Sequence, residues 1–376
     1  GDRWGRVRTF RIGIGVYAIG SLVTALAPTV GVLAIGWSLI EGIGAALVMP
    51  AMVALVGGMY TGRARATAYG VLGGVAGAGV AVGPILGGWV TANATWRLVF
   101  VGEVLVAVAI LLGVRVLREP SRSGRRPQID WTGAALSSIG LALIVFGVLQ
   151  SSAWGWVTPR NSPVVLLGLP LTLWVIGAGS AVLVVFVGWQ RQRERRGVDP
   201  LVHLASFSNR QLRSGLVMLL VQNLILMGIF FSIPLYLQVV QGFDAFETGL
   251  RMLPISVTLF LASAAGPVLA TRASPRAICR VGMVVLFVAT LGLLGRIQPE
   301  IDEVGFLIAM AVLGVGMGLI SSQLGNVVQS SVDESGRGED GGLQYTAQQF
   351  GGALGTALIG AVVLGGLATS FSDLVS

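Results

Sequence analysis

Long apolar segments recur along the whole chain, separated by short segments that contain arginine or proline. A helix needs roughly 20 mostly apolar residues to cross a bilayer, and these apolar runs lack the two-residue alternation of a membrane β-barrel wall. The pattern therefore predicts an all-α integral membrane protein, a helical bundle with eleven spans in this chain. The expected spans are 12–28, 31–56, 68–91, 98–116, 132–150, 163–189, 214–240, 250–270, 278–295, 304–328 and 343–368.

The arginines predict the orientation of this bundle. All 25 residues of the combined lysine and arginine count are arginines. If the residue 1 end is cytoplasmic, every arginine lies inside except Arg97, Arg160, Arg251 and Arg296. Cytoplasmic loops of membrane proteins carry an excess of basic residues. Arginine-only usage with 55 glycines also indicates a GC-rich bacterial genome, so we expect a multi-pass protein of the bacterial inner (cell) membrane with a cytoplasmic residue 1 end.

Composition excludes several classes of protein. The chain is 54% hydrophobic and 11% charged, with a mean hydropathy of +0.82. Without lysine it cannot form a Walker A loop or a pyridoxal Schiff base. One cysteine, Cys279, and one histidine, His203, are too few for a metal site or an internal disulfide. We expect no enzyme activity, no cofactor and no nucleic-acid partner, since no nucleophile, base and orienting group converge in any motif.

Two segments of the chain resemble each other. At an offset of 272, seven residues match residues of the same type: Gly42, Gly44, Arg65, Gly70, Gly79, Gly83 and Gly88 match Gly314, Gly316, Arg337, Gly342, Gly351, Gly355 and Gly360. At an offset of 269, Arg3, Arg11 and Gly13 match Arg272, Arg280 and Gly282. Such a pattern is typical of transporters built from parallel repeats. The alternative is that glycine-rich helices resemble one another because small residues allow close packing.

Five motifs resemble those of the major facilitator superfamily, in its fourteen-helix drug:proton antiporter branch. They are Asp2-Arg3-Trp4-Gly5-Arg6-Val7-Arg8, Gly79-Val80-Ala81-Val82-Gly83-Pro84-Ile85-Leu86-Gly87-Gly88, Ile129-Asp130-Trp131-Thr132-Gly133, Leu235-Tyr236-Leu237-Gln238 and Thr248-Gly249-Leu250-Arg251-Met252-Leu253-Pro254. The resemblance implies a fragment that lacks the first two family helices and the last. It divides the chain into an N-terminal half at 1–117, an inserted helix pair at 118–190 and a C-terminal half at 191–376.

The first two motifs contain candidate functional residues. Asp2, Arg3, Gly5, Arg6 and Arg8 form a candidate cytoplasmic latch, for which a solvated basic loop is the alternative. The resemblance identifies a second set as an antiporter motif: Gly79, Gly83, Pro84, Gly87 and Gly88. The glycines leave one face of the helix without side chains, and the proline favours a kink. This face is either a surface that slides between conformational states or one that only packs tightly against a neighbouring helix.

Two acidic residues lie inside apolar runs, where ionisable groups are costly. Glu41 is the candidate for proton coupling, because the resemblance places it in a cavity-lining helix; a hydrogen bond to a neighbouring helix is the alternative. Glu103 lies about two turns from Trp96 and is expected to reach the outer interface. The family signature carries an arginine three residues before Glu41, but this chain has Ser38 there.

Polar and aromatic residues of the C-terminal half predict a substrate pocket. An apolar pocket with a few hydrogen-bonding groups suits large amphiphilic or cationic molecules, although hydrogen bonds between helices are the alternative for each amide. The candidates are Gln222, Asn223, Met227, Phe230, Gln323, Asn326, Gln344, Tyr345 and Gln348, with Phe231 interleaved among them. Arg191, Arg193, Arg195 and Arg196 are expected to attract anionic lipid head groups.

These observations predict a monomeric secondary transporter that exports hydrophobic or amphiphilic compounds by proton antiport with alternating access. Its expected partners are a small-molecule substrate, protons and a bilayer with anionic lipids. Two alternatives remain open. One is an exporter of a specific lipid, siderophore or self-made antibiotic on the same fold. The other is a membrane receptor or scaffold that does not transport.

Overall fold

The computed structural model describes residues 5–60, 79, 82–83, 85–116, 130–296, 302–329 and 337–375. Several predicted features lie outside these residues: Asp2 and Arg3 of the latch, Pro84 of the antiporter motif, and Arg65 and Gly70 of the repeat. The chain divides into two compact units, which are described separately. One comprises 1–127 and 241–323, and the other comprises 128–240 and 324–376.

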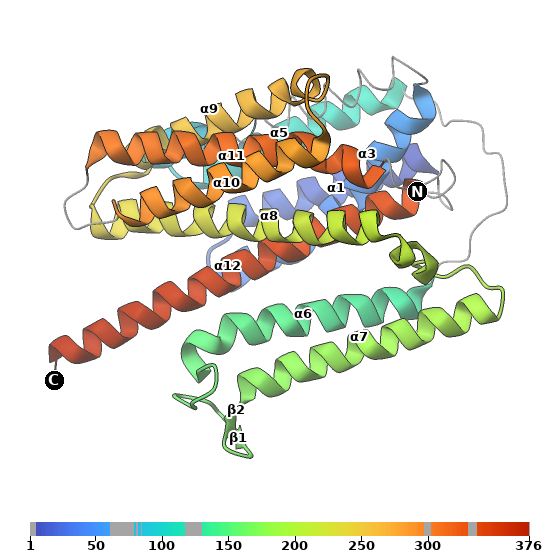
Figure 1. Cartoon of the computed structure of the whole chain (residues 1–376), viewed down its shortest axis with the longest axis horizontal. Helices are drawn as coiled ribbons and strands as arrows, with labels where there is room; N and C mark the ends of the chain where they lie inside the picture. The colour runs from blue at the N-terminus through green and yellow to red at the C-terminus, as the bar shows by residue number, and fades with distance from the viewer. Residues whose placement is uncertain are drawn as a thin grey trace. The chain divides into compact units, whose positions relative to one another are not determined.

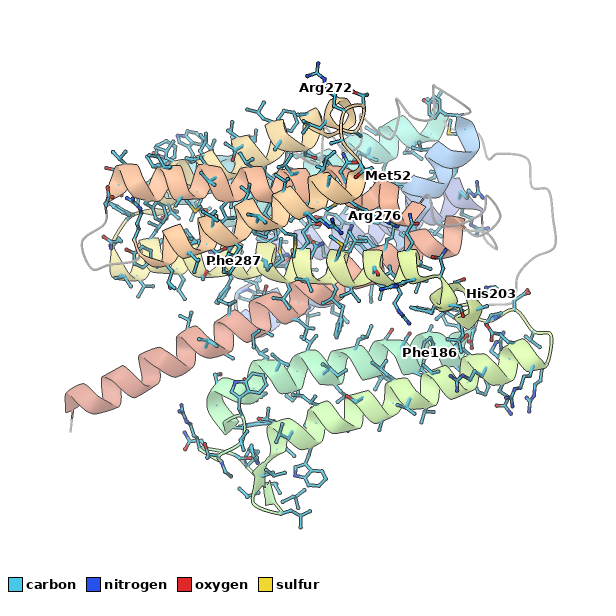
Figure 2. All side chains as sticks on the ribbon, viewed as in Figure 1. Met52, Phe186, His203, Arg272, Arg276 and Phe287 are labelled. Atoms are coloured by element: carbon cyan, nitrogen blue, oxygen red, sulfur yellow. The ribbon has the colours of Figure 1, made fainter. Side chains whose placement is uncertain are left out.

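The first unit contains two groups of helices (Figure 1). The N-terminal group is α1 (Arg6–Ala25), α2 (Val30–Leu33), the π-helix η1 (Ala34–Glu41), α3 (Gly42–Met59), helical residues 85–93, α5 (Arg97–Gly113) and the 3-10 turn η2 (Val114–Val116). The later group is α9 (Ala245–Leu269), α10 (Pro275–Leu294) and α11 (Glu303–Gln329), whose last six residues belong to the second unit. Arg272, labelled in Figure 2, lies in the turn between α9 and α10, and Arg276 lies in the first turn of α10.

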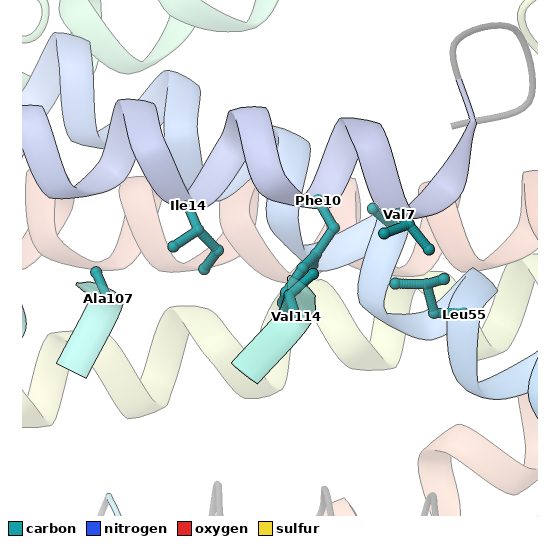
Figure 3. Packing of buried hydrophobic residues seen from close by; sticks show 7 residues of the cluster. Val7, Phe10, Ile14, Leu55, Ala107 and Val114 are labelled. Carbon is teal, nitrogen blue, oxygen red and sulfur yellow. The ribbon is translucent and has the colours of Figure 1, made fainter. Parts of the chain in front are cut away.

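Apolar side chains join α1, α3 and α5 into one core (Figure 3). Val7, Phe10 and Ile14 recur along α1 at helical spacing and are at most 9% exposed. They pack with Leu55 of α3 and Val114 at the end of α5. Burial of such side chains holds the N-terminal group together.

Glycines set the distance between helices in two similar contacts. A Cβ atom at Gly44 of α3 would lie 2.9 Å from the Gly13 carbonyl oxygen and 2.5 Å from the Tyr17 nitrogen of α1. A Cβ atom at Gly316 of α11 would lie 3.0 Å from the Gly282 carbonyl oxygen and 2.7 Å from the Leu286 nitrogen of α10. Both pairs of helices therefore approach as closely as a missing side chain allows.

The second unit contains α6 (Trp131–Trp154), the short strands β1 (Val165–Leu166) and β2 (Leu169–Pro170), α7 (Leu171–Arg195), the 3-10 turn η3 (Leu204–Ser208), α8 (Arg210–Leu235), the π-helix η4 (Tyr236–Val240) and α12 (Arg337–Val375). Within it, α6 packs on α7, and α12 packs on α8 and α6. His203, labelled in Figure 2, precedes η3. Glycine contacts again set the spacing, since a Cβ at Gly179 would lie 2.8 Å from the Gly140 carbonyl oxygen.

The prediction of an all-helical membrane protein is confirmed. Eight described segments are long and apolar enough to cross a membrane: Val30–Met52, Arg97–Val116, Trp131–Trp154, Leu171–Arg195, Arg210–Val240, Ala245–Gly266, Pro275–Leu294 and Glu303–Gln323. The predicted span 163–189 begins too early. An antiparallel β1–β2 hairpin occupies 165–170 and the helix starts at Leu171, because Gly168 turns the chain at a φ of 77° and Pro170 precedes the first helical turn.

Candidate functional site

A cluster of two carboxyl groups and two hydroxyl groups lies among α1, η1 and α5. The Ser21 hydroxyl oxygen is 3.1 Å from Oε2 of Glu41 and 3.0 Å from Oε2 of Glu103. The Tyr17 hydroxyl, one turn away on α1, donates to Oε2 of Glu103 at 3.4 Å. Ser21 is fully buried and Glu41 is 6% exposed. The structure thus joins two acidic residues that are 62 positions apart.

The helices α1 and η1 approach each other closely around this cluster at two glycines, Gly20 and Gly36. A Cβ atom at Gly20 would lie 2.5 Å from the Glu41 nitrogen, and one at Gly36 would lie 2.9 Å from the Thr24 nitrogen. Glu41 ends the π-helix η1 and directly precedes α3. π-helical turns are rare in proteins overall, and many of those that occur lie at functional sites. The chain therefore places Glu41 directly against the backbone of α1.

The expectation for Glu103 is wrong. Its carboxyl group hydrogen-bonds to α1 within the cluster and does not reach out from the helix to the outer interface. The position of Glu103 along α5 predicts its depth in the membrane but not the direction in which its side chain points. In the structure the side chain points toward Ser21. Arg97, on the same helix, turns away from the cluster: it donates to the Ala27 carbonyl at 2.8 Å and lies 4.5 Å above the Trp96 ring.

No ion pair compensates the two carboxyl groups among the residues that the structure describes. The ion pairs of the described residues include Arg193 with Asp130, Arg251 with Glu303 and Arg296 with Asp302, and none of them involves Glu41 or Glu103. Two unpaired negative charges in apolar surroundings carry a large desolvation penalty and repel each other. A neutral carboxyl beside a carboxylate removes most of this cost.

The latch candidates are only partly described. Gly5 caps α1 with a φ of 97°, a conformation that favours glycine. Arg6 is half-buried and Arg8 is exposed in the first turn of α1. Sequence reasoning missed the best-defined arginine contact in this region: Arg11 donates to the Val114 carbonyl at 2.8 Å and joins α1 to the end of α5. The spacing of Arg11 from Arg8 on one helix gave no sign of this partner.

The glycines of the antiporter motif differ in their surroundings. Among the described residues, a Cβ at Gly79, Gly83 or Gly87 would meet no atom within 4 Å, whereas one at Gly88 would collide with the Ala245 carbonyl at the start of α9. Gly88 is the buried member. Close approach therefore explains Gly88, and the other three glycines form an open surface.

The predicted pocket residues fall into two groups. The second unit brings together α8, with Gln222, Asn223, Met227 and Phe230, and α12, with Gln344, Tyr345 and Gln348. Gln323 lies in the first unit, and the side chain of Asn326 is outside the described residues.

Several of the predicted pocket amides already have partners within the protein. Asn223 donates to the Leu219 carbonyl at 3.0 Å, and Gln323 donates to the Gly266 carbonyl at 3.0 Å. Gln344 is 9% exposed, and its amide nitrogen has no hydrogen-bond partner within the described part of the chain. A buried unpaired polar group is costly, so Gln344 has a donor left for a ligand and Gln323, whose Oε1 also has no hydrogen-bond partner within the described part of the chain, has an acceptor.

Asp130 forms a second buried polar cluster, at the base of α6 and α7. It caps α6 by accepting from the Gly133 amide at 2.9 Å, and it accepts from Trp189 at 3.0 Å and Gln190 at 2.8 Å. Arg193 lies 3.6 Å away. Burial raises the pKa of the Asp130 carboxyl, but these donors and the arginine outweigh it and hold the pKa below its ordinary value. The sequence identified this motif without predicting its contacts.

The comparison with known proteins agrees with the fold. The model of the Major Facilitator Superfamily matches residues 1–356. The chain is 28% identical over 376 residues to a tetracenomycin C resistance and export protein of Streptomyces glaucescens, which covers 99% of this chain and 66% of that protein. It is 31% identical over 379 residues to the puromycin resistance protein of Streptomyces alboniger, with 99% and 71% covered.

A third relative comes from another genus. Multidrug resistance protein 3 of Bacillus subtilis is 26% identical over 365 residues, which cover 96% of this chain and 67% of that protein. The chain spans about two thirds of the length of these relatives. The matched family consists of transporters and not enzymes, and the apolar helices are those of a multi-pass membrane protein. The chain belongs to the Major Facilitator Superfamily.

Proposed function

We propose that the protein exports hydrophobic or amphiphilic compounds across the bacterial inner membrane by alternating access, in exchange for protons. The names of the relatives, which include resistance and export proteins for antibiotics, support the export of such compounds. The cluster of Glu41, Ser21 and Glu103 is the observation that carries the coupling to protons.

The hydrogen-bond geometry supports one shared proton at this cluster. A serine hydroxyl has a single hydrogen and donates it to one acceptor at a time. Ser21 lies within hydrogen-bond distance of both Glu41 and Glu103. If both carboxyls were ionised, one of the two contacts would be an oxygen facing an oxygen without a proton. A proton on either carboxyl satisfies both contacts, and its release leaves two like charges that favour rearrangement of the helices.

The internal repeat supports a functional role for the acid. The offset of 272 pairs Glu41 with Leu313, which is fully buried in α11. The offset of 269 pairs Tyr17 with Leu286 and Ser21 with Thr290. The matching glycine contacts of Gly44 and Gly316 are kept in both copies. The close helix packing therefore does not require an acid at this position, because the second copy has Leu313 where the first has Glu41.

The finer architecture that we propose is the one expected from the sequence. Eleven spans form two repeated halves, 1–117 and 191–376, with the pair α6–α7 inserted at 118–190. The residue 1 end is cytoplasmic and the protein acts as a monomer. The matched glycine contacts support the repeat, and the arginine distribution supports the orientation. Gly88 then lies in a motif whose open glycines supply a surface for sliding between states.

The substrate is proposed to bind beside α8 and α12. Gln344 offers an amide donor without a partner among the described residues, and Met227 is 37% exposed. Tyr345 and Gln348 are half-buried on the same helix as Gln344. A mainly apolar surface with few polar groups fits large compounds without strict specificity.

The test is efflux of a fluorescent dye from proteoliposomes that contain the full-length protein, under an imposed pH gradient. Collapse of the gradient by an ionophore should stop efflux. Glu41→Gln removes a titrating group with little change in volume, and we expect it to reduce gradient-driven efflux by at least tenfold. Glu103→Gln should have an effect of the same order if the two carboxyls share the proton.

The matched control is Asp199→Asn, which neutralises a carboxyl outside the spans, whereas the Asp199 contact to Arg193 uses the backbone carbonyl. Substrate counterflow without a gradient separates coupling from binding, because a coupling variant keeps counterflow. Unchanged gradient-driven efflux in both glutamine variants would refute the coupling proposal. Absence of any efflux or counterflow from the folded wild-type protein, over a broad dye panel, would refute the export proposal.

A further inference from the structure

We propose that the outward face of α7 holds one anionic phospholipid, with its phosphate at Arg191 and an acyl chain in the groove next to Gly188. A groove of about 480 Å³ lies along this helix and is lined by Leu183, Val184, Val187, Gly188 and Arg191. The groove is shallow and open, and all of its lining residues lie on α7. The lining is apolar except at the arginine end.

One residue of the groove, Gly188, has no side chain. Val184, Gly188, Arg191 and Arg195 are spaced by four, three and four residues, so they lie on one face of α7. Gly188 is exposed, and a Cβ built on it meets no neighbouring atom within 4 Å. The space beside Gly188 is therefore open, and no packing contact with the described residues explains this glycine.

The arginine of the groove has an uncommitted charge. Arg191, Arg195 and Arg196 are exposed, and none of them forms an ion pair with a described carboxylate. Arg193 differs, because it faces Asp130 and donates to the Asp199 carbonyl at 2.8 Å. The basic end of α7 is thus divided: the half-buried Arg193 faces Asp130, and the exposed Arg191 lines the groove.

Position and charge together select a lipid of the cytoplasmic leaflet. The groove runs along a segment, Leu171–Arg195, that is long and apolar enough to span a bilayer, and its arginine lies near the end of that segment. Basic residues in such positions attract anionic head groups. An acyl chain beside Gly188 with a phosphate at Arg191 satisfies both ends of the groove, whereas a free phosphate ion would leave the apolar part empty.

The experiment measures retention of phosphatidylglycerol by the purified full-length protein, using native mass spectrometry during a lipid titration. Gly188→Leu fills the groove without a clash in the protein and should weaken the tightest binding step by about tenfold. Gly177→Leu is the matched control, because Gly177 lies on α7, is exposed and also has no neighbour within 4 Å. Arg191→Gln should weaken binding of phosphatidylglycerol to a similar degree.

Three results would overturn the proposal. The first is equal retention by Gly188→Leu and Gly177→Leu. The second is equal sensitivity of phosphatidylcholine and phosphatidylglycerol to Arg191→Gln, which would show that the negative charge is not recognised. The third is displacement of the bound lipid by millimolar glycerol phosphate, which would show that the head group binds without the groove. Unfolding of each variant is measured in parallel, and lipid retention is compared only among variants with wild-type stability.

Discussion

Asp130→Ala tests whether a single buried carboxylate holds the base of the α6–α7 pair. The substitution removes an acceptor from three hydrogen bonds of 2.8–3.0 Å, donated by Gly133, Trp189 and Gln190. It also removes the charge that faces Arg193 at 3.6 Å. Gln190 is fully buried, so its amide nitrogen would be left without water or a protein acceptor.

The expected loss in the free energy of unfolding is about 3–5 kcal/mol, the range observed when one partner of a buried charged network is removed. The costs expected for the separate contacts are of the same order of magnitude. Loss of a helix N-cap costs about 1 kcal/mol, and a buried donor left without a partner costs about 1–3 kcal/mol. The parts are not added, because all of the contacts share one carboxylate.

The measurement is equilibrium unfolding of the full-length protein in mixed micelles at pH 7, followed by tryptophan fluorescence. Asp199→Ala is the control, since Arg193 donates its hydrogen bonds to the backbone carbonyl of Asp199, which the substitution keeps. We expect the control to change the free energy of unfolding by less than about 0.5 kcal/mol, as is usual for exposed positions. A loss in Asp130→Ala no larger than that of the control would show that the contacts around Asp130 do not hold the pair.

Three further predictions concern other contacts. Because the pKa of Asp130 is lowered in the folded protein, its stabilising contribution is present above the ordinary pKa and is lost as pH falls through the folded value; acid unfolding below about pH 4 should therefore be less steep in Asp130→Asn than in wild type. Gly44→Ala places a Cβ 2.5 Å from the Tyr17 nitrogen and should cost about 1–3 kcal/mol, whereas Gly42→Ala, which meets no neighbour, should be neutral or stabilising in the same unfolding assay. Arg251→Gln removes the 2.9 Å ion pair with Glu303 and the contact with the Phe243 ring; we expect a loss of about 1–2 kcal/mol, and a Glu303→Gln variant as unstable as Arg251→Gln would contradict a contribution from the ring.

The helices were predictable because continuous apolar runs leave few alternatives. Boundaries failed where local turn residues outweighed hydrophobicity. The residues Val165–Pro170 read as part of an apolar run, yet Gly168 and Pro170 turn the chain into a hairpin. These two residues were the available signal, since glycine and proline mark turns even within apolar sequence. The π-helix Ala34–Glu41 had no such signal, because its composition is that of an ordinary apolar helix.

Half of the carboxyl cluster was predictable. Glu41 stands out as an acid in an apolar run, and the structure describes it as buried. Glu103 was misassigned because its partners, Ser21 and Tyr17, lie on a different helix. Ser21 and Tyr17 are four residues apart and so share a face of α1, and they are a polar pair within the otherwise apolar stretch 12–23 of that helix. That pair was a usable signal for an acidic partner, but the sequence does not specify which helix supplies it.

The arginines at the end of α7 show why charge counts predict orientation but not function. Arg191 and Arg193 contribute equally to the positive-inside pattern. They are two residues apart, however, and each residue advances a helix by about 100°, so their side chains point in nearly opposite directions. One direction leads to the buried carboxylate of Asp130 and the other to the groove beside Gly188. Arg193 is held by Asp130, whereas Arg191 has no ion pair with a described carboxylate, so Arg191 is the one available to a lipid. Neutralising the two arginines should therefore have different effects: lost stability for Arg193 and lost lipid retention for Arg191.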